Sequence, residues 1–281
     1  SAGFHNRRKE LIGIMKKARL IYGVMGIVLI LILISIGYYQ FQKRTHLCTP
    51  YPFMNIQQQE SDSITSIIII GDSWGDLAFQ NQMPQTLDSM MLIYGVNTHT
   101  MAKGEHGAIS RKIYKNLFME KNDINSTRAL IEQNPQYAIV FCGMNDSHGQ
   151  YGKEFYAYHT SLIIQTLLHY HIKPILLELP MYNITKQYAY YPYYKKLMYR
   201  ILSWFTDKTT HIKNVERYRT ALREKLIHQG LYDKIQWVSI DSLCTKDFYK
   251  DYMHLNKKGY QHLSQIIATT ILNDLELHNK E

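Results

Sequence analysis

Side chains in three short segments could together perform nucleophilic chemistry. Ser73 ends a Gly-Asp-Ser triplet that directly follows an apolar, β-branched run. Asn145 lies in a Gly-Met-Asn-Asp segment, and Asp251 precedes His254 by three residues. A serine hydroxyl is a weak nucleophile until a base takes its proton. Because Ser73 follows a predicted buried strand, it is a candidate nucleophile at the edge where α/β sheets hold ligands.

The hydrophobic pattern predicts the elements that position these residues. Apolar runs predict strands at residues 64–70, 91–98, 137–142, 173–179 and 235–240. Helical patterns occupy residues 110–121, 154–171, 193–206, 214–228 and 256–276. This alternation predicts an α/β, flavodoxin-like three-layer fold with a five-stranded parallel sheet. Ser73 and Asn145 then reach the same edge of that sheet, because each follows a strand.

Residues 20–39 contain no charged side chain and are strongly apolar. A helix of about 20 residues spans the hydrocarbon core of a bilayer. Tyr22, Tyr38 and Tyr39 lie near the two ends of the segment, as interfacial aromatic residues do. We therefore predict one transmembrane helix, with a buried core helix and a cleaved signal peptide as the alternatives.

The positive charge of the chain is concentrated around that segment. Of the 32 basic residues, six precede it within residues 1–19, against Glu10 alone. From residue 45 onward, 24 basic residues face 22 acidic ones, so no nucleic-acid partner is predicted. The basic amino-terminal side predicts a cell-membrane, single-pass protein with residues 1–19 in the cytoplasm and the remainder extracytoplasmic.

The predicted organisation has four parts, and three cysteines are too few for a disulfide framework. A cytoplasmic basic tail at 1–19 and a transmembrane helix at 20–39 precede a linker at 40–62 and an extracytoplasmic domain at 63–281. Cys142 lies in a predicted strand, whereas a bridge between Cys48 and Cys244 stays open. No metal motif and no nucleotide motif occurs, so neither a metal nor a cofactor is predicted.

The chemistry-bearing segments resemble the four sequence blocks of the SGNH (GDSL-type) hydrolase family. Gly-Asp-Ser, a central glycine-containing loop, Gly-Met-Asn-Asp and Asp-x-x-His occur in the order of the family, over residues 64–260. The resemblance implies a serine acyl-ester enzyme in which Ser73 is the nucleophile, His254 the base and Asp251 the acid that orients it.

An oxyanion hole is also implied by the resemblance, since acyl transfer develops negative charge on the carbonyl oxygen. It assigns the Ser73 backbone N–H, a loop glycine N–H and the Asn145 side-chain amide; a turn-forming role is the alternative for Asn145. Either Gly104 or Gly107 could be the glycine. Gly107 is favoured because Ser110 follows it by three residues, as a small or hydroxyl residue does in the family. Lys103, Glu105 and His106 make this loop more charged and bulkier than the commonest version.

Four further residues are candidate substrate contacts. Trp74 follows the nucleophile and could line a pocket or simply pack. His148 follows Asn145 by three residues and could reach substrate or be an exposed loop residue. Tyr191 and Tyr194 belong to a tyrosine-rich stretch after the fourth strand, whose flat faces suit a sugar ring. That stretch could equally form a partly buried lid or a membrane-facing patch.

These features predict an esterase or O-acyltransferase that acts on O-acyl, mainly O-acetyl, groups of cell-envelope glycans. The partners that the resemblance implies are an acylated glycan or ester substrate, the membrane and a membrane-bound O-acyltransferase. A second hypothesis is a lipase or thioesterase for membrane lipids, with an acyl groove lined by Met83, Met90, Met91 and the tyrosines. A third is a non-catalytic glycan-binding scaffold subunit that keeps the fold.

Overall fold

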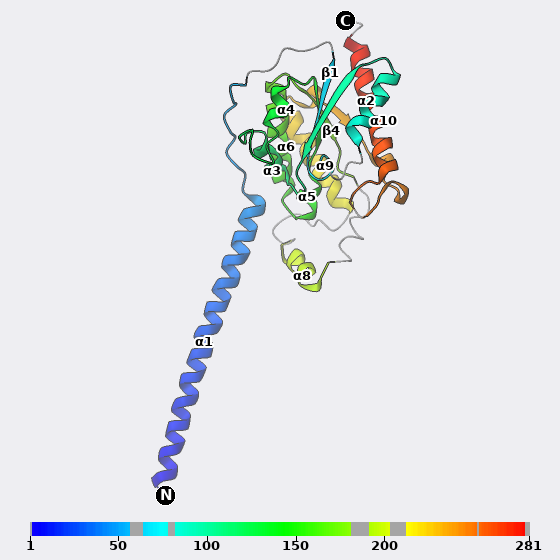
Figure 1. Cartoon of the computed structure of the whole chain (residues 1–281). Helices are drawn as coiled ribbons and strands as arrows, with labels where there is room; N and C mark the ends of the chain where they lie inside the picture. The colour runs from blue at the N-terminus through cyan, green and yellow to red at the C-terminus, as the bar shows by residue number, and fades with distance from the viewer. Residues whose placement is uncertain are drawn as a thin grey trace. The chain divides into compact units, whose positions relative to one another are not determined.

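The computed structural model describes residues 2–56, 64–77, 82–180, 191–202, 212–251 and 253–278. The chain divides into two compact units, Ser1–Arg44 and Thr45–Glu281 (Figure 1). Helix α1, Ala2–Thr45, makes up the first unit and ends at the first residue of the second; it contains the predicted span at residues 20–39. Its segment Gly13–Thr45 is long and apolar enough to cross a membrane, although a signal sequence would meet the same criterion.

The second unit is built on a five-stranded, entirely parallel sheet in the order β2-β1-β3-β4-β5. This is the flavodoxin-like order, and it confirms the predicted α/β class. The strands are β1 Thr65–Gly71, β2 Thr98–Gly104, β3 Tyr137–Phe141, β4 Lys173–Leu177 and β5 Gln236–Val238. Because all strands are parallel, their carboxyl ends meet at one edge, and this edge carries Ser73.

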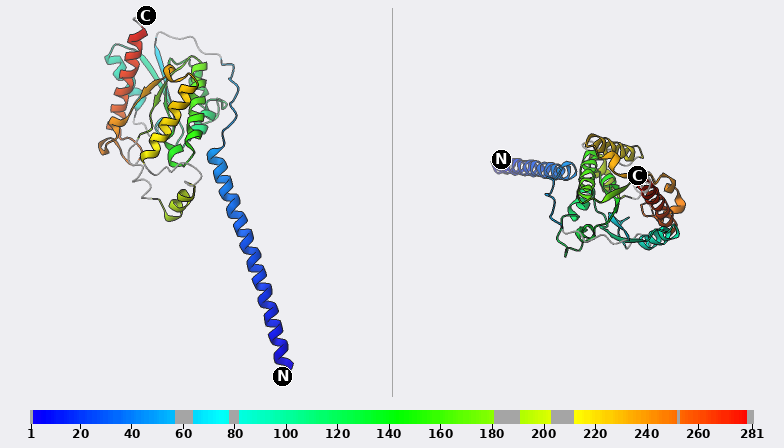
Figure 2. Two further views of the ribbon diagram at one scale, coloured as in Figure 1. Left: turned by 180° about the vertical axis from the view of Figure 1, so that it is seen from behind. Right: turned by 90° about the horizontal axis from the view of Figure 1, so that it is seen from above.

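Helices cover both faces of the sheet and complete the three layers (Figure 2). The first face packs on α3 Ser110–Asn116, α4 Arg128–Glu132, α5 Met144–His148, α6 Lys153–His169 and α9 Ile212–His228. The opposite face packs on α2 Met83–Ile93 and α10 Lys257–His278. The remaining described elements are α8 Tyr193–Leu202 and three short 3₁₀ turns, Tyr232–Lys234, Asp241–Leu243 and Lys246–Phe248.

Strand β1 shows why this chain folds around a central apolar run. Ile68 and Ile70 pack into one core cluster, while Ile67 and Ile69 pack into the cluster on the opposite face. All four side chains are fully buried. A strand covered by helices on both faces needs a continuous apolar sequence rather than an alternating one, so β1 sits centrally and presents Ser73 from a rigid base.

The predicted strand at residues 91–98 is wrong. Met91 ends a buried helical stripe with Leu87 on α2, and Gly95, at φ 77°, follows that helix. The edge strand β2 begins only at Thr98. Its buried threonines are polar but satisfied: the Thr98 hydroxyl donates to Asp88 Oδ1 at 2.7 Å, and the Thr100 backbone N–H donates to Asp88 Oδ2 at 3.1 Å.

Other element boundaries differ from the sequence-based ones by smaller amounts. Helix α3 ends at Asn116 rather than at residue 121, and the predicted strand at 235–240 shortens to β5. Helices α2, α4 and α5 were not predicted. Of the predicted helix at 193–206, α8 covers the first part, and residues 203–206 lie outside the described residues. Cys48, Cys142 and Cys244 are free thiols.

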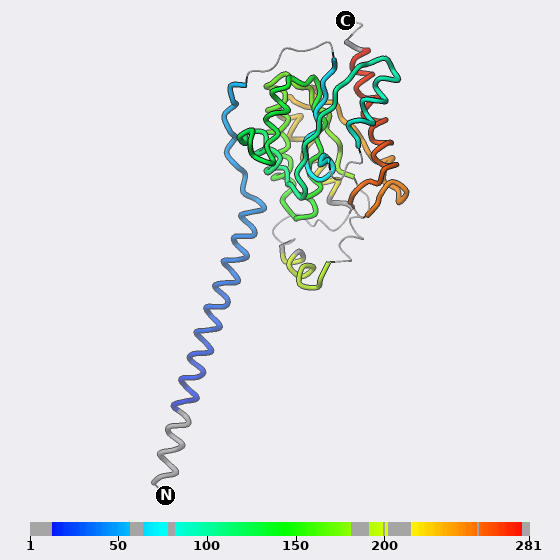
Figure 3. The backbone as a smooth tube through the Cα atoms, in the orientation of Figure 1, coloured from blue at the N-terminus to red at the C-terminus, as the bar shows by residue number. Residues whose placement is uncertain are grey.

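Residues 46–56 pack against the second unit, although they belong to the predicted linker. The backbone N–H of Tyr51 donates to the Tyr114 hydroxyl on α3 at 2.9 Å. The backbone N–H of Met54 donates to the Tyr170 hydroxyl, just after α6, at 2.8 Å. The path of this segment beside α3 and α6 can be followed in Figure 3.

Candidate active site

Ser73, His254 and Asp251 form a continuous hydrogen-bonded chain at the carboxyl edge of the sheet. His254 Nε2 lies 3.1 Å from Ser73 Oγ. The other ring nitrogen, Nδ1, lies 2.8 Å from Asp251 Oδ2 and 3.1 Å from Oδ1. A carboxylate that holds Nδ1–H leaves Nε2 free to accept a proton from the serine. The three residues predicted from separate segments therefore have the geometry of a nucleophile, a base and an orienting acid.

The turn that carries Asp251 and His254 is held by the acid itself. Asp251 Oδ1 accepts the backbone N–H groups of Met253 and His254, each at 2.8 Å. Burial raises the pKa of Asp251, but these two N–H groups and the imidazole outweigh it and bring the net pKa below the usual range. Asp251 is therefore ionised at neutral pH, which is the state that orients and stabilises a histidinium.

Trp74 connects the nucleophile loop to the histidine turn. Its indole Nε1–H donates to the backbone carbonyl of Met253 at 2.9 Å. The ring is only 3% exposed and contacts Phe141, Tyr249 and Tyr260 with centroid distances of 6.0 to 6.5 Å. Packing is thus the main role of the side chain, and its hydrogen bond fixes the spacing between Ser73 and His254.

Asn145 is brought beside both of the other predicted oxyanion donors. Its Nδ2 donates to the backbone carbonyl of Ala108, the residue after Gly107, at 3.0 Å. The same Nδ2 lies 3.5 Å from Asp72 Oδ2, in the residue before Ser73. Among the described residues, neither the Ser73 N–H nor the Gly107 N–H donates a hydrogen bond. Donors that are left unused at a nucleophile are what an oxyanion hole requires.

Different structural constraints explain why glycine occurs at positions 104 and 107. A Cβ at Gly104 would lie 2.4 Å from the Asp72 carbonyl oxygen, so this end of β2 needs glycine for packing against the nucleophile loop. Gly107 has φ 73° and open space around the position of a Cβ. A left-handed conformation turns its backbone where the loop passes the site. Gly107 stays the predicted oxyanion donor, with Gly104 as the alternative.

The fold that carries this site is similar to the folds of several solved esterase structures. No protein-family profile matches the sequence, and no curated protein matches it. Among solved structures, the esterase EstA of a Pseudoalteromonas species has 14% identity and a TM-score of 0.52, covering 75% of this chain and 99% of that one. A family 3 carbohydrate esterase of Clostridium thermocellum has 13% identity and a TM-score of 0.51, covering 76% and 98%. A candidate acylhydrolase of Bacteroides fragilis has 13% identity and a TM-score of 0.51, covering 79% and 92%.

The chain has the SGNH-hydrolase fold. The structural likeness covers about three quarters of the chain and nearly the full length of each esterase structure. At identities near 14% it establishes the fold alone, and the roles of individual residues stay predictions that rest on the geometry of the site.

Two buried carboxyl groups stabilise the loops of this SGNH-type site. Asp72 Oδ1 accepts the Trp74 N–H at 3.0 Å, and Asp146 Oδ2 accepts the Ser110 N–H at 2.8 Å. Burial raises the pKa of Asp72 to about 7 and that of Asp146 to about 6, against hydrogen bonds that lower both. Asp72 lies beside the Asn145 amide, and Asp146 accepts the Ser110 N–H just after the loop that carries Gly107. Both acids are therefore positioning residues.

The remaining predicted contacts have different positions. His148 ends α5 and is no exposed loop residue: both ring nitrogens are buried without a hydrogen-bond partner among the described residues, and burial lowers its pKa to about 4. Tyr194 is 72% exposed on α8, and Lys195 Nζ lies 4.5 Å from the centre of the Tyr191 ring. No contact joins any of these three to Ser73 among the described residues.

His106 is a site residue that sequence reasoning noted only as a bulky member of the loop. Its ring lies nearly parallel to that of His254, with 6.2 Å between the ring centroids. The side chain is exposed and directly precedes Gly107. Its position next to the glycine was the only available sequence signal. His106 therefore lies close to the imidazole of His254.

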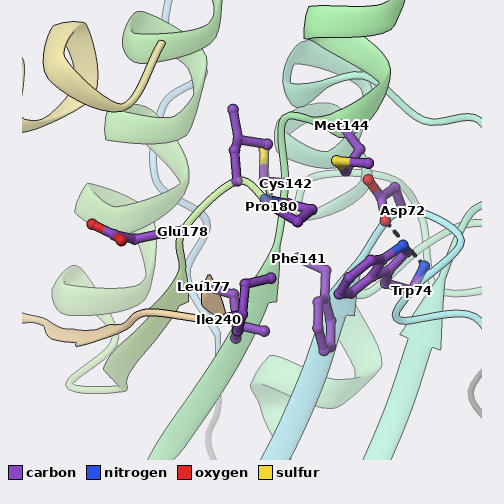
Figure 4. A pocket seen from close by; sticks show the side chains of 10 residues that line it. Asp72, Trp74, Phe141, Cys142, Met144, Leu177, Glu178, Pro180 and Ile240 are labelled. Atoms are coloured by element: carbon purple, nitrogen blue, oxygen red, sulfur yellow. Dashed lines mark hydrogen bonds between the residues drawn. The ribbon is translucent and has the colours of Figure 1, made fainter. Parts of the chain in front are cut away.

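A small cavity lies behind the nucleophile loop (Figure 4). Its volume is about 10 Å³, and Asp72, Trp74, Phe141 and Met144 contribute to its lining. Glu178 points away from the other lining side chains, toward its ion pair with Arg223. This volume holds about one water molecule. Among the described residues, no group of histidine, cysteine and acidic side chains could hold a metal ion.

Proposed function

We propose that this chain is a membrane-anchored serine acyl-ester enzyme that acts on O-acetyl groups of cell-envelope glycans. The observation that carries the proposal is the 3.1 Å contact between Ser73 Oγ and His254 Nε2, with Asp251 at 2.8 Å behind the imidazole. Solved structures described as esterases share this fold and support ester chemistry, and one of them is described as a carbohydrate esterase.

The proposed reaction begins with attack of Ser73 Oγ on the ester carbonyl carbon. The serine proton moves to His254 Nε2, while Asp251 stabilises the resulting imidazolium through Nδ1. Negative charge develops on the carbonyl oxygen, where the N–H groups of Ser73 and Gly107 and the Asn145 amide would meet it. His254 then gives its proton to the leaving alcohol as the C–O bond breaks, and an acetyl-Ser73 intermediate remains.

The intermediate is resolved by a second hydroxyl compound. If water attacks, with His254 again accepting the proton, acetate is released and the enzyme is an esterase. If a sugar hydroxyl attacks by the same route, the acetyl group moves to the sugar and the enzyme is an O-acyltransferase. The proposal covers both, since the oxyanion donors treat both acceptors alike.

The proposed location follows from α1. We propose residues 1–19 as a cytoplasmic tail, residues 20–39 as the span, and an extracytoplasmic SGNH-type domain that follows. The basic residues before the span support this orientation. A membrane-bound O-acyltransferase that delivers acetyl groups is the proposed partner for the transferase reaction.

The lipid-directed alternative receives less support from the described residues. Met83 and Met91, which were predicted to line an acyl groove, are fully buried in the core between α2 and the sheet. Met90 packs against the same core cluster. The cavity behind Ser73 has room for about one water molecule. These side chains therefore provide no groove for a long acyl chain.

A single-turnover experiment with the full chain and an activated acetyl ester tests the proposal. We expect one acetyl group per chain on Ser73, and none in the Ser73→Ala variant. Ser89→Ala is a matched control, because Ser89 is an exposed serine on α2 whose hydroxyl bonds only to its own helix. Acetylated and free glycan acceptors are added to separate samples.

The outcomes separate the candidate functions. A rate of acetate release that is the same with and without free glycan identifies an esterase. Slow release that free glycan accelerates, with the acetyl group found on the sugar, identifies a transferase. Faster turnover of longer acyl chains would favour the lipase. Equal inertness of the wild type and Ser73→Ala toward every ester would contradict the catalytic proposal and favour a scaffold subunit.

A further inference from the structure

Helix α8 exposes an apolar face that the chemistry at Ser73 does not use. Tyr193, Tyr194, Leu197 and Ile201 are 80%, 72%, 45% and 43% exposed. With about 100° between successive residues, these four positions fall within one narrow arc of the helix. The face is therefore continuous along the helix rather than a scatter of single apolar residues.

Basic residues accompany this face. Helix α8 contains Lys195, Lys196 and Arg200 and no acidic residue. On a helical projection Arg200 and Lys196 border the apolar arc on one side. An apolar face with a basic border is the composition of helices that lie in the interface of a bilayer with anionic headgroups.

The topology attaches α8 at the active-site edge of the sheet. The chain leaves this edge after Pro180, which lines the cavity behind Asp72 and Trp74. It returns in α9, where Arg219 Nε donates to the Leu179 carbonyl at 2.8 Å. Helix α8 lies between these two points, and Figures 1 and 2 show it beyond the carboxyl ends of the strands. The apolar face therefore belongs to the same end of the unit as Ser73.

The chain also enters this unit at the active-site edge. Three residues after α1 ends at Thr45, the Tyr158 hydroxyl donates to the Cys48 carbonyl at 2.8 Å. Arg111 Nη1 donates to the His46 carbonyl at 3.4 Å. Tyr158 is in the first half of α6 and Arg111 in the first turn of α3, and both helices start from the carboxyl edge. From the end of the proposed span at residue 39, six helical residues and three extended ones together reach about 20 Å.

We propose that the apolar face of α8 is a bilayer-contact surface that seats the active-site edge on the membrane from which α1 emerges. The proposal rests on the membrane span proposed above. The connection is short enough for this edge to reach the bilayer, and in this proposal the face and its basic border supply the contact. Substrate then reaches Ser73 along the membrane surface rather than from bulk solution.

Fluorescence of the full chain in vesicles of phosphatidylcholine and anionic phosphatidylglycerol tests this surface. A polarity-sensitive label is placed on Tyr193→Cys, with Cys48→Ser and Cys244→Ser as the background and the buried Cys142 retained. The matched control is Ile93→Cys, because Ile93 is also 80% exposed but ends α2 at the opposite edge of the sheet. Quenchers on lipid acyl chains and iodide in water report the surroundings of the label.

We expect the lipid quencher to reduce emission at position 193 several-fold more than at position 93, and iodide to do the reverse. Adding Leu197→Glu should abolish lipid quenching at 193 while the chain stays in the vesicle fraction. Equal quenching at both positions would overturn the proposal, as would protection of position 193 from iodide without lipid quenching, which means that protein covers the face. Loss of the chain from the vesicles would instead overturn the span, and none of these readouts depends on catalysis.

Discussion

The acidic residues on the two sides of Ser73 have opposite surroundings. On the histidine side, the Asp251 side chain is 42% exposed, and its pKa lies below the usual range. On the oxyanion side, Asp72 and Asp146 are buried, and burial raises their pKa to about 7 and about 6. The same residue type is therefore held in its ionised form on one side and made harder to ionise on the other.

The difference shows how environment assigns the roles of carboxyl groups within one site. A charged Asp251 can stabilise a histidinium, which is needed only while the proton is in transit. Asp72, with a pKa of about 7, is partly protonated at neutral pH and so contributes hydrogen bonds with less than a full negative charge. We therefore infer that Asp72 and Asp146 position loops, whereas Asp251 would take part in the proposed reaction.

Removing the charge of Asp251, on the histidine side, should lower kcat more than any other substitution below. Asp251→Asn leaves the size of the side chain unchanged but no longer favours the reactive state of His254, and we expect kcat to fall about 10³ to 10⁴-fold. Hydrolysis of an activated acetyl ester measures the loss. Asp247→Asn, an exposed acid on the preceding turn, is the control and should change little. A loss below tenfold would mean that Asp251 only shapes the turn.

Removing the proposed oxyanion donor Asn145 should lower kcat less than removing the charge of Asp251. Asn145→Ala deletes one of three donors, so kcat should fall about 10² to 10³-fold with little change in KM. The fall should be similar for acetyl esters with good and poor leaving groups, because the oxyanion forms with both. An unchanged kcat would assign Asn145 to the turn and remove it from the reaction.

Asp72→Asn should change the pH dependence of stability more than it changes catalysis. The pKa of Asp72 is raised from 3.8 to about 7 in the folded state, so its contribution to stability is present below about pH 4 and is lost as pH rises to 7. The free energy of unfolding of the wild type minus that of the variant should therefore be larger at pH 4 than at pH 8, by about 1 to 4 kcal/mol. Chemical denaturation at both pH values measures it.

The control for that comparison is Asp233→Asn, which makes the same substitution at an exposed aspartate. His148 and His159 act in the opposite direction, since burial lowers the pKa of each to about 4. Their contributions cancel in the difference between wild type and variant. A difference that grows with pH would contradict the raised pKa of Asp72.

Trp74→Phe should have the smallest effect, because it leaves the ring packing and removes only the bond to the Met253 carbonyl. A neutral hydrogen bond contributes about 1 kcal/mol, so we expect kcat to fall about fivefold. KM for an acetyl ester should be unchanged, since the bond spaces the triad rather than contacting substrate. A change in KM alone would show that Trp74 contacts substrate after all.

The sequence predicted the parallel sheet because strand patterns are local, and it predicted the grouping of Ser73, His254 and Asp251 through the resemblance to a known family. The apolar run before Ser73 predicts a buried strand. The short spacing between Asp251 and His254 predicts that both residues lie on one turn. The prediction of the edge strand was wrong because β2 carries buried threonines, whose hydroxyl and N–H groups bond to Asp88, ten residues before Thr98. A strand stabilised by a carboxylate from a neighbouring helix has no apolar signature of its own.

The carboxyl network could not be predicted for a related reason. Asp146 meets Ser110 and Asp72 meets Asn145 only after the loops have assembled, and these pairs are separated by 36 and 73 positions. Sequence spacing gives no distance between such residues. His106 likewise became a neighbour of His254 only through the path of the loop.

The bond between α2 and β2 also has a consequence for the order in which the chain folds. Asp88 and Thr98 close a loop of about ten residues, whereas pairing β1 with β3 joins residues about 70 positions apart. The entropy lost on closing a loop grows with its length. We therefore expect α2 and β2 to form early, so that the edge of the sheet is already covered by its helix when the central strands begin to pair.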